Sequence, residues 1–394
     1  MNYRVIANLF FLLFLGVADN QAIAALLPPL VKSFGITVAS AGLMVTVYSL
    51  AAALAAFASG SLSDHFGRRR FLVVGALVFA LASWLSSRCQ TFPEILLARS
   101  LTGLAAGTIS TCSIAYAGDW FAYAVRGRAV SLISMAYFMA PIVGVPLATQ
   151  IADRFGWRHA FQYFALAALL VAMTSFTLPR DVLNPQPSRE RVRSTVAAFR
   201  SFLARRDTLA ALVVAFLVSA GLVGFITYIG QWLNTRFDLP TRTVGWVFML
   251  SGLVAVGSAP LGGSASDKWG KRPVSIAGNV LLAVAIVAIP FLDWGVGLLV
   301  VFAATSLGAA IRQGPLTALM TEMVPAAQRG SFIALRNIAS QLGIGSVAVV
   351  GGILFQHYGY AAVTSLCAGM TALVAVLLAT HIDEPQAARQ EREA

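Results

Sequence analysis

Two charged residues stand deep inside long apolar stretches of this sequence. Asp19 lies in the first stretch, about 14 residues from its inner end, and Arg99 lies in the fourth, about 7 residues from its outer end. The two stretches cross in opposite directions, and a helix rises 1.5 Å per residue, so both side chains fall at a similar depth in the outer half of a membrane. We therefore expect Asp19 and Arg99 to pair.

Such a pair could bind and release a proton. Burial disfavours the charged form of a carboxyl group, and a neighbouring guanidinium favours it. A movement that separates Asp19 from Arg99 would let the acid take a proton, so proton and substrate can compete at this site. The alternative is a permanent ion pair that holds the first and fourth segments together. Either way a partner is required, because an unpaired charge inside a membrane costs about 3 kcal/mol.

Composition identifies the elements that would position these side chains. The 394 residues are 58% hydrophobic and 11% charged, against about a quarter charged in a soluble domain. A membrane-spanning helix needs about 20 apolar residues, and the sequence is an all-α polytopic membrane protein with twelve such segments. They are residues 5–29, 38–62, 71–88, 92–117, 129–151, 157–179, 208–234, 242–265, 273–291, 294–320, 330–356 and 358–381.

Basic residues set the topology. Of the 28 Lys and Arg residues, Arg99 and Arg312 lie well inside spans, and six fall on the outer side if the chain starts in the cytoplasm. The six are Lys32, Arg88, Arg154, Arg158, Arg236 and Arg242. The other 20 lie inside, which predicts two cytoplasmic termini in the cytoplasmic (inner) membrane of a bacterium. The net charge of +12 thus reflects topology and attraction to anionic lipid, and nucleic acid is excluded as a partner.

One pattern occurs twice. Residues 60–70 and 263–272 share Gly-x-x-x-Asp-x-x-Gly followed by basic residues, with Asp64 and Asp267 separated by 203 positions. The same offset links Gly42 with Gly245, Gly75 with Gly278, Arg126-Gly127 with Arg329-Gly330, Phe155-Gly156-Trp157 with Tyr358-Gly359-Tyr360, and Asp119 with Glu322. We infer two parallel six-helix halves, residues 1–180 and 208–382, related by a pseudo-twofold axis along the membrane normal.

The halves are joined by a polar linker, residues 181–207, and followed by a short polar tail, residues 383–394. In the linker, apolar residues recur at spacings of three and four between arginines. This pattern predicts a basic amphipathic helix on the cytoplasmic leaflet.

The duplicated loop resembles the signature loop of the major facilitator superfamily, between spans 2 and 3 and again between 8 and 9. The resemblance implies that spans 1 and 4 of each half line a central cavity, and that the loops latch in one conformation. Residues 99–107, Arg followed by spaced glycines, resemble the span-4 motif of proton coupling. Residues 140–146 resemble the Gly-Pro-x-x-Gly-Gly motif of proton-driven exporters, from which Ala140 and Val145 depart.

The loops suggest gating chemistry. Gly60 would let a neighbouring helix approach, Gly67 would permit a tight turn, and Asp64 would accept from a helix start or pair with an Arg across the two halves. The other reading is a plain turn carrying topogenic charge. Further gating candidates are Arg68, Arg69, Asp119, Arg126, Gly263, Asp267, Gly270, Lys271, Arg272, Glu322 and Arg329.

Substrate contacts are harder to infer. Arg312, with Gln313, is either an anchor for an anionic or polar substrate group or a side chain that reaches the cytoplasmic interface or pairs with Glu322. The other candidates are Asn20, Gln21, Tyr116, Tyr137, Tyr228, Gln231 and Gln341, each of which could equally be a packing or interhelical hydrogen-bonding residue.

Catalysis and cofactors are not expected. The four histidines lie in loops or at span ends, the three cysteines lack metal or redox spacing, and the sequence has no Walker loop for ATP. We therefore predict no enzyme, no metal and no cofactor.

The sequence thus predicts a monomeric secondary transporter of the major facilitator type, resembling the drug:proton antiporter branch. It would export a small amphiphilic or polar molecule by alternating access, driven by protons. The alternative is a proton-independent facilitator or flippase of an anionic amphiphile, such as a lysolipid or organic acid. A receptor or assembly factor that no longer transports is a third possibility.

Overall fold

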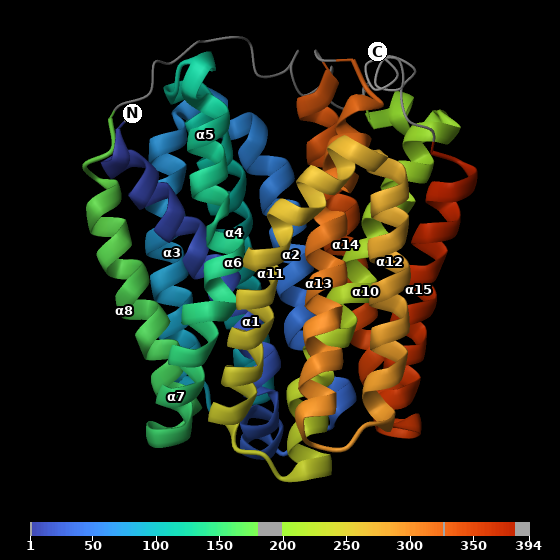
Figure 1. The fold of residues 1–394 in the computed structure, drawn as a ribbon. Helices are drawn as coiled ribbons and strands as arrows, with labels where there is room; N and C mark the ends of the chain where they lie inside the picture. The colour runs from blue at the N-terminus through green and yellow to red at the C-terminus, as the bar shows by residue number, and fades with distance from the viewer. Residues whose placement is uncertain (1, 180–198, 326–327, 383–394) are drawn as a thin grey trace. The chain divides into compact units, whose positions relative to one another are not determined.

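The computed structural model describes residues 2–179, 199–325 and 328–382, and every regular element in these ranges is a helix. The helices are α1 (Tyr3–Phe34), α2 (Val38–Phe66), α3 (Arg68–Arg88), α4 (Phe92–Trp120), α5 (Tyr123–Ser134), α6 (Ala136–Met139), the π-helix η1 (Ala140–Gly144), α7 (Val145–Phe155), α8 (Trp157–Ser175), α10 (Arg206–Phe237), α11 (Thr241–Trp269), α12 (Lys271–Ala288), the 3₁₀-helix η2 (Ile289–Phe291), α13 (Val296–Glu322), α14 (Arg329–Tyr358) and α15 (Tyr360–Thr380) (Figure 1).

Eleven of the described helical segments are long and apolar enough to cross a membrane. One of them, Val125–Phe155, is interrupted at α6 and η1. The twelfth span is α8, whose 19 residues include Arg158, His159 and Gln162 near the start, so its mean hydropathy is lower. Its inner face is nevertheless buried against α3 and α1. The architecture is therefore the predicted one of twelve transmembrane helices in two pseudo-symmetric halves.

The helix bounds repeat with the offset found in the sequence. Adding 203 to the bounds of α1 gives those of α10, and adding 203 to those of α2 gives those of α11. The first residue of α3 maps likewise onto the first residue of α12, and the last residue of α7 onto the last residue of α14. The two halves therefore share one helical frame, and corresponding positions can be compared directly.

Two compact units emerge from the packing. Unit 1 comprises residues 1–192 with 227–249, and unit 2 comprises residues 193–226 with 250–394. In unit 1 the tightest helix packing joins α2 with α4 and α3 with α4 and α8. In unit 2 it joins α12 with α13 and α15 (Figure 1).

Residues 227–249 belong to unit 1 because of three contacts. Gly230 lies directly against the backbone of Ala24, and Gly245 lies directly against Thr149. Arg242 Nε is 3.8 Å from Asp153 Oδ2, close to the chain reversal between α10 and α11. Glycine is needed at the first contact because an added Cβ would overlap a main-chain carbonyl oxygen.

The duplicated loops turn at glycine in both halves. Gly67 and Gly270 have φ of 94° and 102°, a region that residues with a Cβ rarely adopt, so the predicted tight turn is present in each loop. The expected close approach at Gly60 is wrong, because a Cβ there would meet no atom within 4 Å, and the same holds for Gly263.

Close approach occurs instead in α4. A Cβ at Gly103 would overlap the backbone of Tyr48, and one at Gly107 would overlap the backbone of Ala52. Both glycines lie on one face of α4 at a spacing of four, and they allow α2 to pack backbone to backbone. The glycines that follow Arg99 therefore fix the distance between α4 and α2.

The end of the linker packs on protein. Residues 180–198 lie outside the described part, as does the tail 383–394, so most of the predicted amphipathic helix is not described. Its last turn is helical, and Phe202 is buried with its ring edge-on to Phe332 at 5.5 Å. This part of the apolar face therefore packs on the core of unit 2, and our expectation that it rests on lipid is wrong for Phe202.

The α2–α4 crossing gives a stability prediction. Gly107→Leu should destabilise the protein by about 3 kcal/mol or more, because the side chain meets main-chain atoms of Ala52 that cannot rotate away. Gly118→Ala in the same helix is the control, since it points into open space and should stabilise by up to about 1 kcal/mol. Thermal unfolding in detergent measures both, and equal effects would contradict the crossing.

Candidate functional site

Asp19 and Arg99 are paired in unit 1. Arg99 Nη1 donates to Asp19 Oδ2 at 2.6 Å, and both side chains are at most 1% exposed. The carboxylate comes from α1 and the guanidinium from α4, as their depths in the sequence indicate. Helix α1 is held beside α4 by Gly16, whose added Cβ would lie 3.4 Å from the Cβ of Ala106.

A tyrosine from α2 completes the group. The guanidinium carbon of Arg99 lies 4.7 Å from the ring centroid of Tyr48, a cation–π distance. The Tyr48 hydroxyl donates to the carbonyl of Gly16 at 3.2 Å, which fixes the ring between α1 and α4. Sequence reasoning missed Tyr48. Its only signal was its place on the helix face that meets Gly103.

The pair is incompletely satisfied. In the described structure Asp19 Oδ1, Arg99 Nε and Arg99 Nη2 are buried without hydrogen-bond partners. A structural ion pair in a low-dielectric interior repays its desolvation only when the remaining donors and acceptors are bonded too. The two side chains therefore share one hydrogen bond, while three of their buried polar atoms lack a described partner.

The second half has no counterpart of this group. The positions 203 residues after Asp19 and Arg99 are occupied by Leu222 and Phe302, and Phe302 is 3% exposed. The position after Tyr48 is Ser251, whose hydroxyl lies 2.7 Å from that of Ser306. The second half therefore builds the same helical frame with apolar residues at these two positions.

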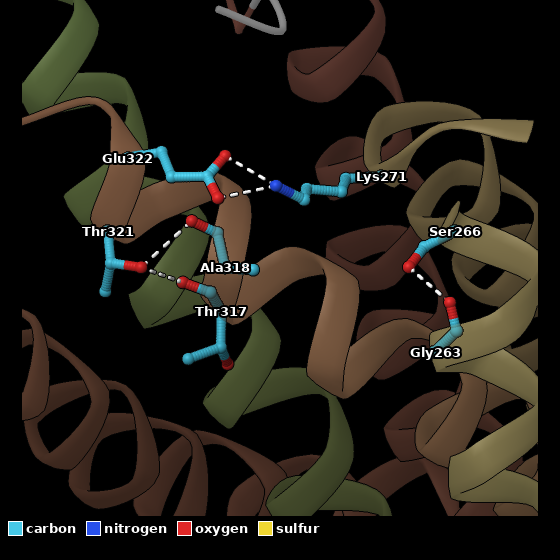
Figure 2. A network of polar contacts seen from close by, with 7 residues as sticks. All are labelled: Gly263, Ser266, Lys271, Thr317, Ala318, Thr321 and Glu322. Carbon is cyan, nitrogen blue, oxygen red and sulfur yellow. Dashed lines mark hydrogen bonds and ion pairs between the residues drawn. The ribbon is translucent and has the colours of Figure 1, made fainter. Parts of the chain in front are cut away.

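The charges at the duplicated loops pair within each half. Arg68 Nε lies 2.8 Å from Asp119 Oδ2 in unit 1, and Lys271 Nζ lies 2.5 Å from Glu322 Oε1 in unit 2 (Figure 2). These are corresponding positions, so the start of the third helix is tied to the end of the fourth in both halves. The exposed fractions, 66% for Asp119 and 33% for Glu322, imply a small contribution to stability from each pair.

The next basic residue caps another helix. Arg69 donates to the carbonyl of Phe176 at the end of α8, and Arg272 donates to the carbonyls of Leu378, at 2.7 Å, and Ala379 near the end of α15. Cations are favoured at helix C-termini, where carbonyls lack helical partners. Residues proposed for gating thus brace each half internally.

The remaining gating candidates are at the surface. Arg126 Nε donates to the carbonyl of Phe121 at 3.3 Å, and Arg329 begins α14 in an exposed position. Asp267 is exposed and makes no ion pair with any described residue. The side chain of Asp64 lies outside what is described, so the contact expected of it stays a prediction.

Arg312 is buried in unit 2. It is 0% exposed, donates through Nη1 to Asn279 Oδ1, and has Nη2 3.5 Å from the carbonyl of Val218. Its Nε has no partner in the described structure. Neither interface snorkelling nor pairing with Glu322 is observed, because Glu322 binds Lys271. Sequence reasoning missed Asn279.

Of the polar candidates, one has a structural role. The Tyr116 hydroxyl donates to the carbonyl of Pro179 at 2.9 Å, and its ring stacks on Trp120. Tyr228 is fully buried and Gln231 is 7% exposed, on either side of Gly230 in α10.

The others have partly open surroundings. Asn20, Gln21 and Gln341 are half-buried, whereas Tyr137 and Gln313 are exposed. In the described structure the carbonyl oxygens of Asn20, Gln21 and Gln231 have no hydrogen-bond donor. All three lie in unit 1.

Span 5 is broken where its prolines lie. The π-helix Ala140–Gly144 contains Pro141, and α7 resumes with Pro146 in its first turn. Gly144 faces Ala18 of α1, which a Cβ would contact at 2.5 Å. The corresponding helix of the second half, α14, has no interruption, so the two halves differ here.

Comparison with known proteins gives the family. A sequence model of the Major Facilitator Superfamily matches residues 9–264 and 232–394, which together cover nearly the whole chain. The chain belongs to this superfamily. It is a multi-pass membrane transporter.

Relatives agree over most of their length. The chain is 26% identical to the uncharacterized MFS-type transporter YwfA of Bacillus subtilis, over 92% of this chain and 88% of that protein. It is 28% identical to a probable 4-methylmuconolactone transporter of Cupriavidus pinatubonensis (87% and 81%) and 24% identical to multidrug resistance protein 2 of B. subtilis (91% and 90%).

A solved structure supports the fold. The crystal structure of a D-xylose-proton symporter matches this transporter with a TM-score of 0.78, covering 97% of this chain and 98% of that chain. The identity is 19%, so the likeness shows the fold alone.

The apolar equivalents in the second half predict how the pair can be replaced. Arg99→Phe alone should cost about 3–5 kcal/mol, because it leaves the Asp19 carboxyl buried without its partner. Adding Asp19→Leu should recover most of that loss, since Leu222 and Phe302 occupy these positions in unit 2. Thermal unfolding in detergent tests both variants. A double variant no more stable than Arg99→Phe would show that the pair is structurally required.

Proposed function

We propose that this transporter is a proton-coupled exporter of a small amphiphilic or polar molecule, with Asp19 as the proton site and Arg99 as its exchangeable partner. The observation that carries the proposal is the single hydrogen bond between two fully buried, opposite charges with three neighbouring polar atoms unsatisfied. The absence of such charges from the matching positions of the second half supports a role beyond stability.

The chemistry follows from burial. With Arg99 beside it, the Asp19 carboxylate is stabilised in its charged form, and without that neighbour it binds a proton more readily. A shift of α1 against α4 changes this contact. Arg99 stays charged throughout, because a guanidinium does not deprotonate in proteins. It therefore becomes available to a substrate or water when the acid is protonated.

The surrounding groups suit this exchange. Tyr48 holds the guanidinium against its ring and offers it a neutral partner when the carboxylate leaves. The π-turn at Ala140–Gly144 packs on α1 one residue before Asp19, at Ala18. Because π-turns relax to α-helix with a change of register, a movement of span 5 is well placed to shift Asp19.

The rest of the proposal concerns the scaffold. Residues 1–180 and 208–382 act as two lobes that alternate access to a central cavity, and the duplicated loops with Asp64 and Asp267 latch one of the states. Both termini lie in the cytoplasm, and the protein works as a monomer in the bacterial inner membrane. Asn20, Gln21 and Gln231, with their open amide oxygens, are proposed to contact substrate.

Coupling predicts a defined loss in one variant. In proteoliposomes containing a pH-sensitive dye, one of three amphiphiles (cationic ethidium, neutral chloramphenicol or anionic benzenesulfonate) should drive a pH change. Asp19→Asn should reduce that proton flux at least tenfold, about 1.4 kcal/mol, because the amide cannot carry a proton. Asp153→Asn is the matched control, since Asp153 pairs loosely with Arg242 at 3.8 Å and should retain coupling.

The outcome of this assay distinguishes the proton-coupled exporter from the alternative function. Proton flux that persists in Asp19→Asn overturns the assignment of the proton site. Transport of a probe without any pH change in the unmodified protein favours the alternative, a facilitator or flippase of an anionic amphiphile. That alternative draws on one specific observation, the buried Arg312, which makes no ion pair in the described structure.

A further inference from the structure

The helix crossing that contains Arg312 exists in both halves. Gly278 of α12 lies against Arg312 of α13, with an added Cβ 3.0 Å from the Arg312 Cβ. In the first half Gly75 of α3 lies against Ile109 of α4, with a Cβ 3.1 Å from Ile109 Cγ1. Ile109 and Gly75 are the residues 203 positions before Arg312 and Gly278. The same crossing is therefore built once with isoleucine and once with arginine.

The residue that hydrogen-bonds to Arg312 also differs between the two halves. Asn279 accepts from Arg312, and its counterpart in the first half is Ala76, which is 1% exposed. Ala76 and Ile109 form an ordinary apolar contact region, so the frame needs no polar group here. Burying a guanidinium against a neutral amide is unfavourable, and the first half avoids this because its residues at these positions are apolar. The presence of Asn279 and Arg312, where the first half has Ala76 and Ile109, therefore points to a role other than building the fold.

Arg312 retains capacity for an anion. Its charge is unmatched by any described acid, its Nε is unpartnered, and its contact with Val218 is long at 3.5 Å. A guanidinium presents a planar fork that fits the two oxygens of a carboxylate. The amide nitrogen of Asn279 donates to the carbonyl of Ser275 at 2.7 Å, so Asn279 orients Arg312 through its amide oxygen and Arg312 supplies the donors for an anion. One cation matches a single negative charge.

The helix that carries Arg312 provides a route. Residue 315 is proline, so the carbonyl of Ile311 has no main-chain N–H four residues later. Gly314 next to it has no atom within 4 Å of an added Cβ. Gln313 is exposed although it lies within a span, and a polar side chain there is favoured where it meets water or protein. A bend at Gly314–Pro315 would open the crossing around Arg312 toward this face of α13.

We propose that Arg312 and Asn279 form a binding site for the carboxylate of an amphiphilic monocarboxylate substrate. The site deepens the transport function proposed above, and it does not depend on the proton step at Asp19. It assigns the substrate one anionic group and an apolar body.

The test is equilibrium binding of radiolabelled benzoate to the full-length protein in lipid nanodiscs, with benzamide as the uncharged competitor. The key variant is Asn279→Ala with Arg312→Ile, which installs the Ala76–Ile109 pair of the first half. We expect this double variant to fold with an unchanged or raised Tm and to bind benzoate at least tenfold more weakly, about 1.4 kcal/mol. Arg312→Lys should show an intermediate loss, because a lysine keeps the charge without the fork.

Three results would overturn the site. They are equal benzoate affinity in the double variant, benzamide competing as well as benzoate, and a large fall in Tm, which would make Arg312 structural. Saturable binding of chloride but not benzoate would overturn the substrate class. Asp153→Asn is the control and should leave benzoate affinity unchanged, because Asp153 lies outside both proposed sites and pairs loosely with Arg242 at 3.8 Å. Proton coupling is read as a pH change and this site as equilibrium binding, so their failures are seen in different assays.

Discussion

A carboxylate and a guanidinium 2.6 Å apart in a membrane interior constrain everything around them. Their attraction is strong in a low dielectric, yet each lost water must be replaced by a fixed polar group. Here only Tyr48 and one mutual hydrogen bond replace it. The contact between Asp19 and Arg99 therefore depends on how closely α1, α2 and α4 pack. The glycines of α4 set this packing, and a small helix shift changes the charge balance of the site.

The internal repeat separates scaffold from function. Features present in both halves, such as the glycine turns at Gly67 and Gly270 and the helix ends bound by Arg69 and Arg272, belong to the frame. Features present in one half have another reason. Asp19 with Arg99 stands against Leu222 with Phe302, and Arg312 with Asn279 stands against Ile109 with Ala76. Each asymmetry places a buried charge where the other half has an apolar side chain. The desolvation of Asp19 and Arg99 falls in the first half, and that of Arg312 falls in the second.

Sequence alone predicted the elements because hydropathy and the 203-residue offset are properties of composition and order. It predicted that Asp19 and Arg99 meet, since depth follows from counting residues along two helices. It could not find Tyr48 or Asn279, because neither carries charge and their importance lies in which neighbour they face. The same limit explains the wrong prediction of a close helix approach at Gly60, because the rotation of the helix points the Cα hydrogen of this glycine into open space. Rotation about a helix axis is set by packing, which a single uniformly apolar segment does not reveal.

The two asymmetric sites differ in what they can exchange. Arg312 keeps its charge at every physiological pH, so it can select an anion but cannot carry a proton. In the proposed function Asp19 gains and loses a proton, and its contact with Arg99 determines when. For a monocarboxylate held at Arg312, the inside-negative membrane potential favours export by about 2.3 kcal/mol per 100 mV, and inward movement of one proton at Asp19 adds about the same again. In the proposed exchange, anion recognition in one half and proton entry through the other thus favour transport in the same direction, outward.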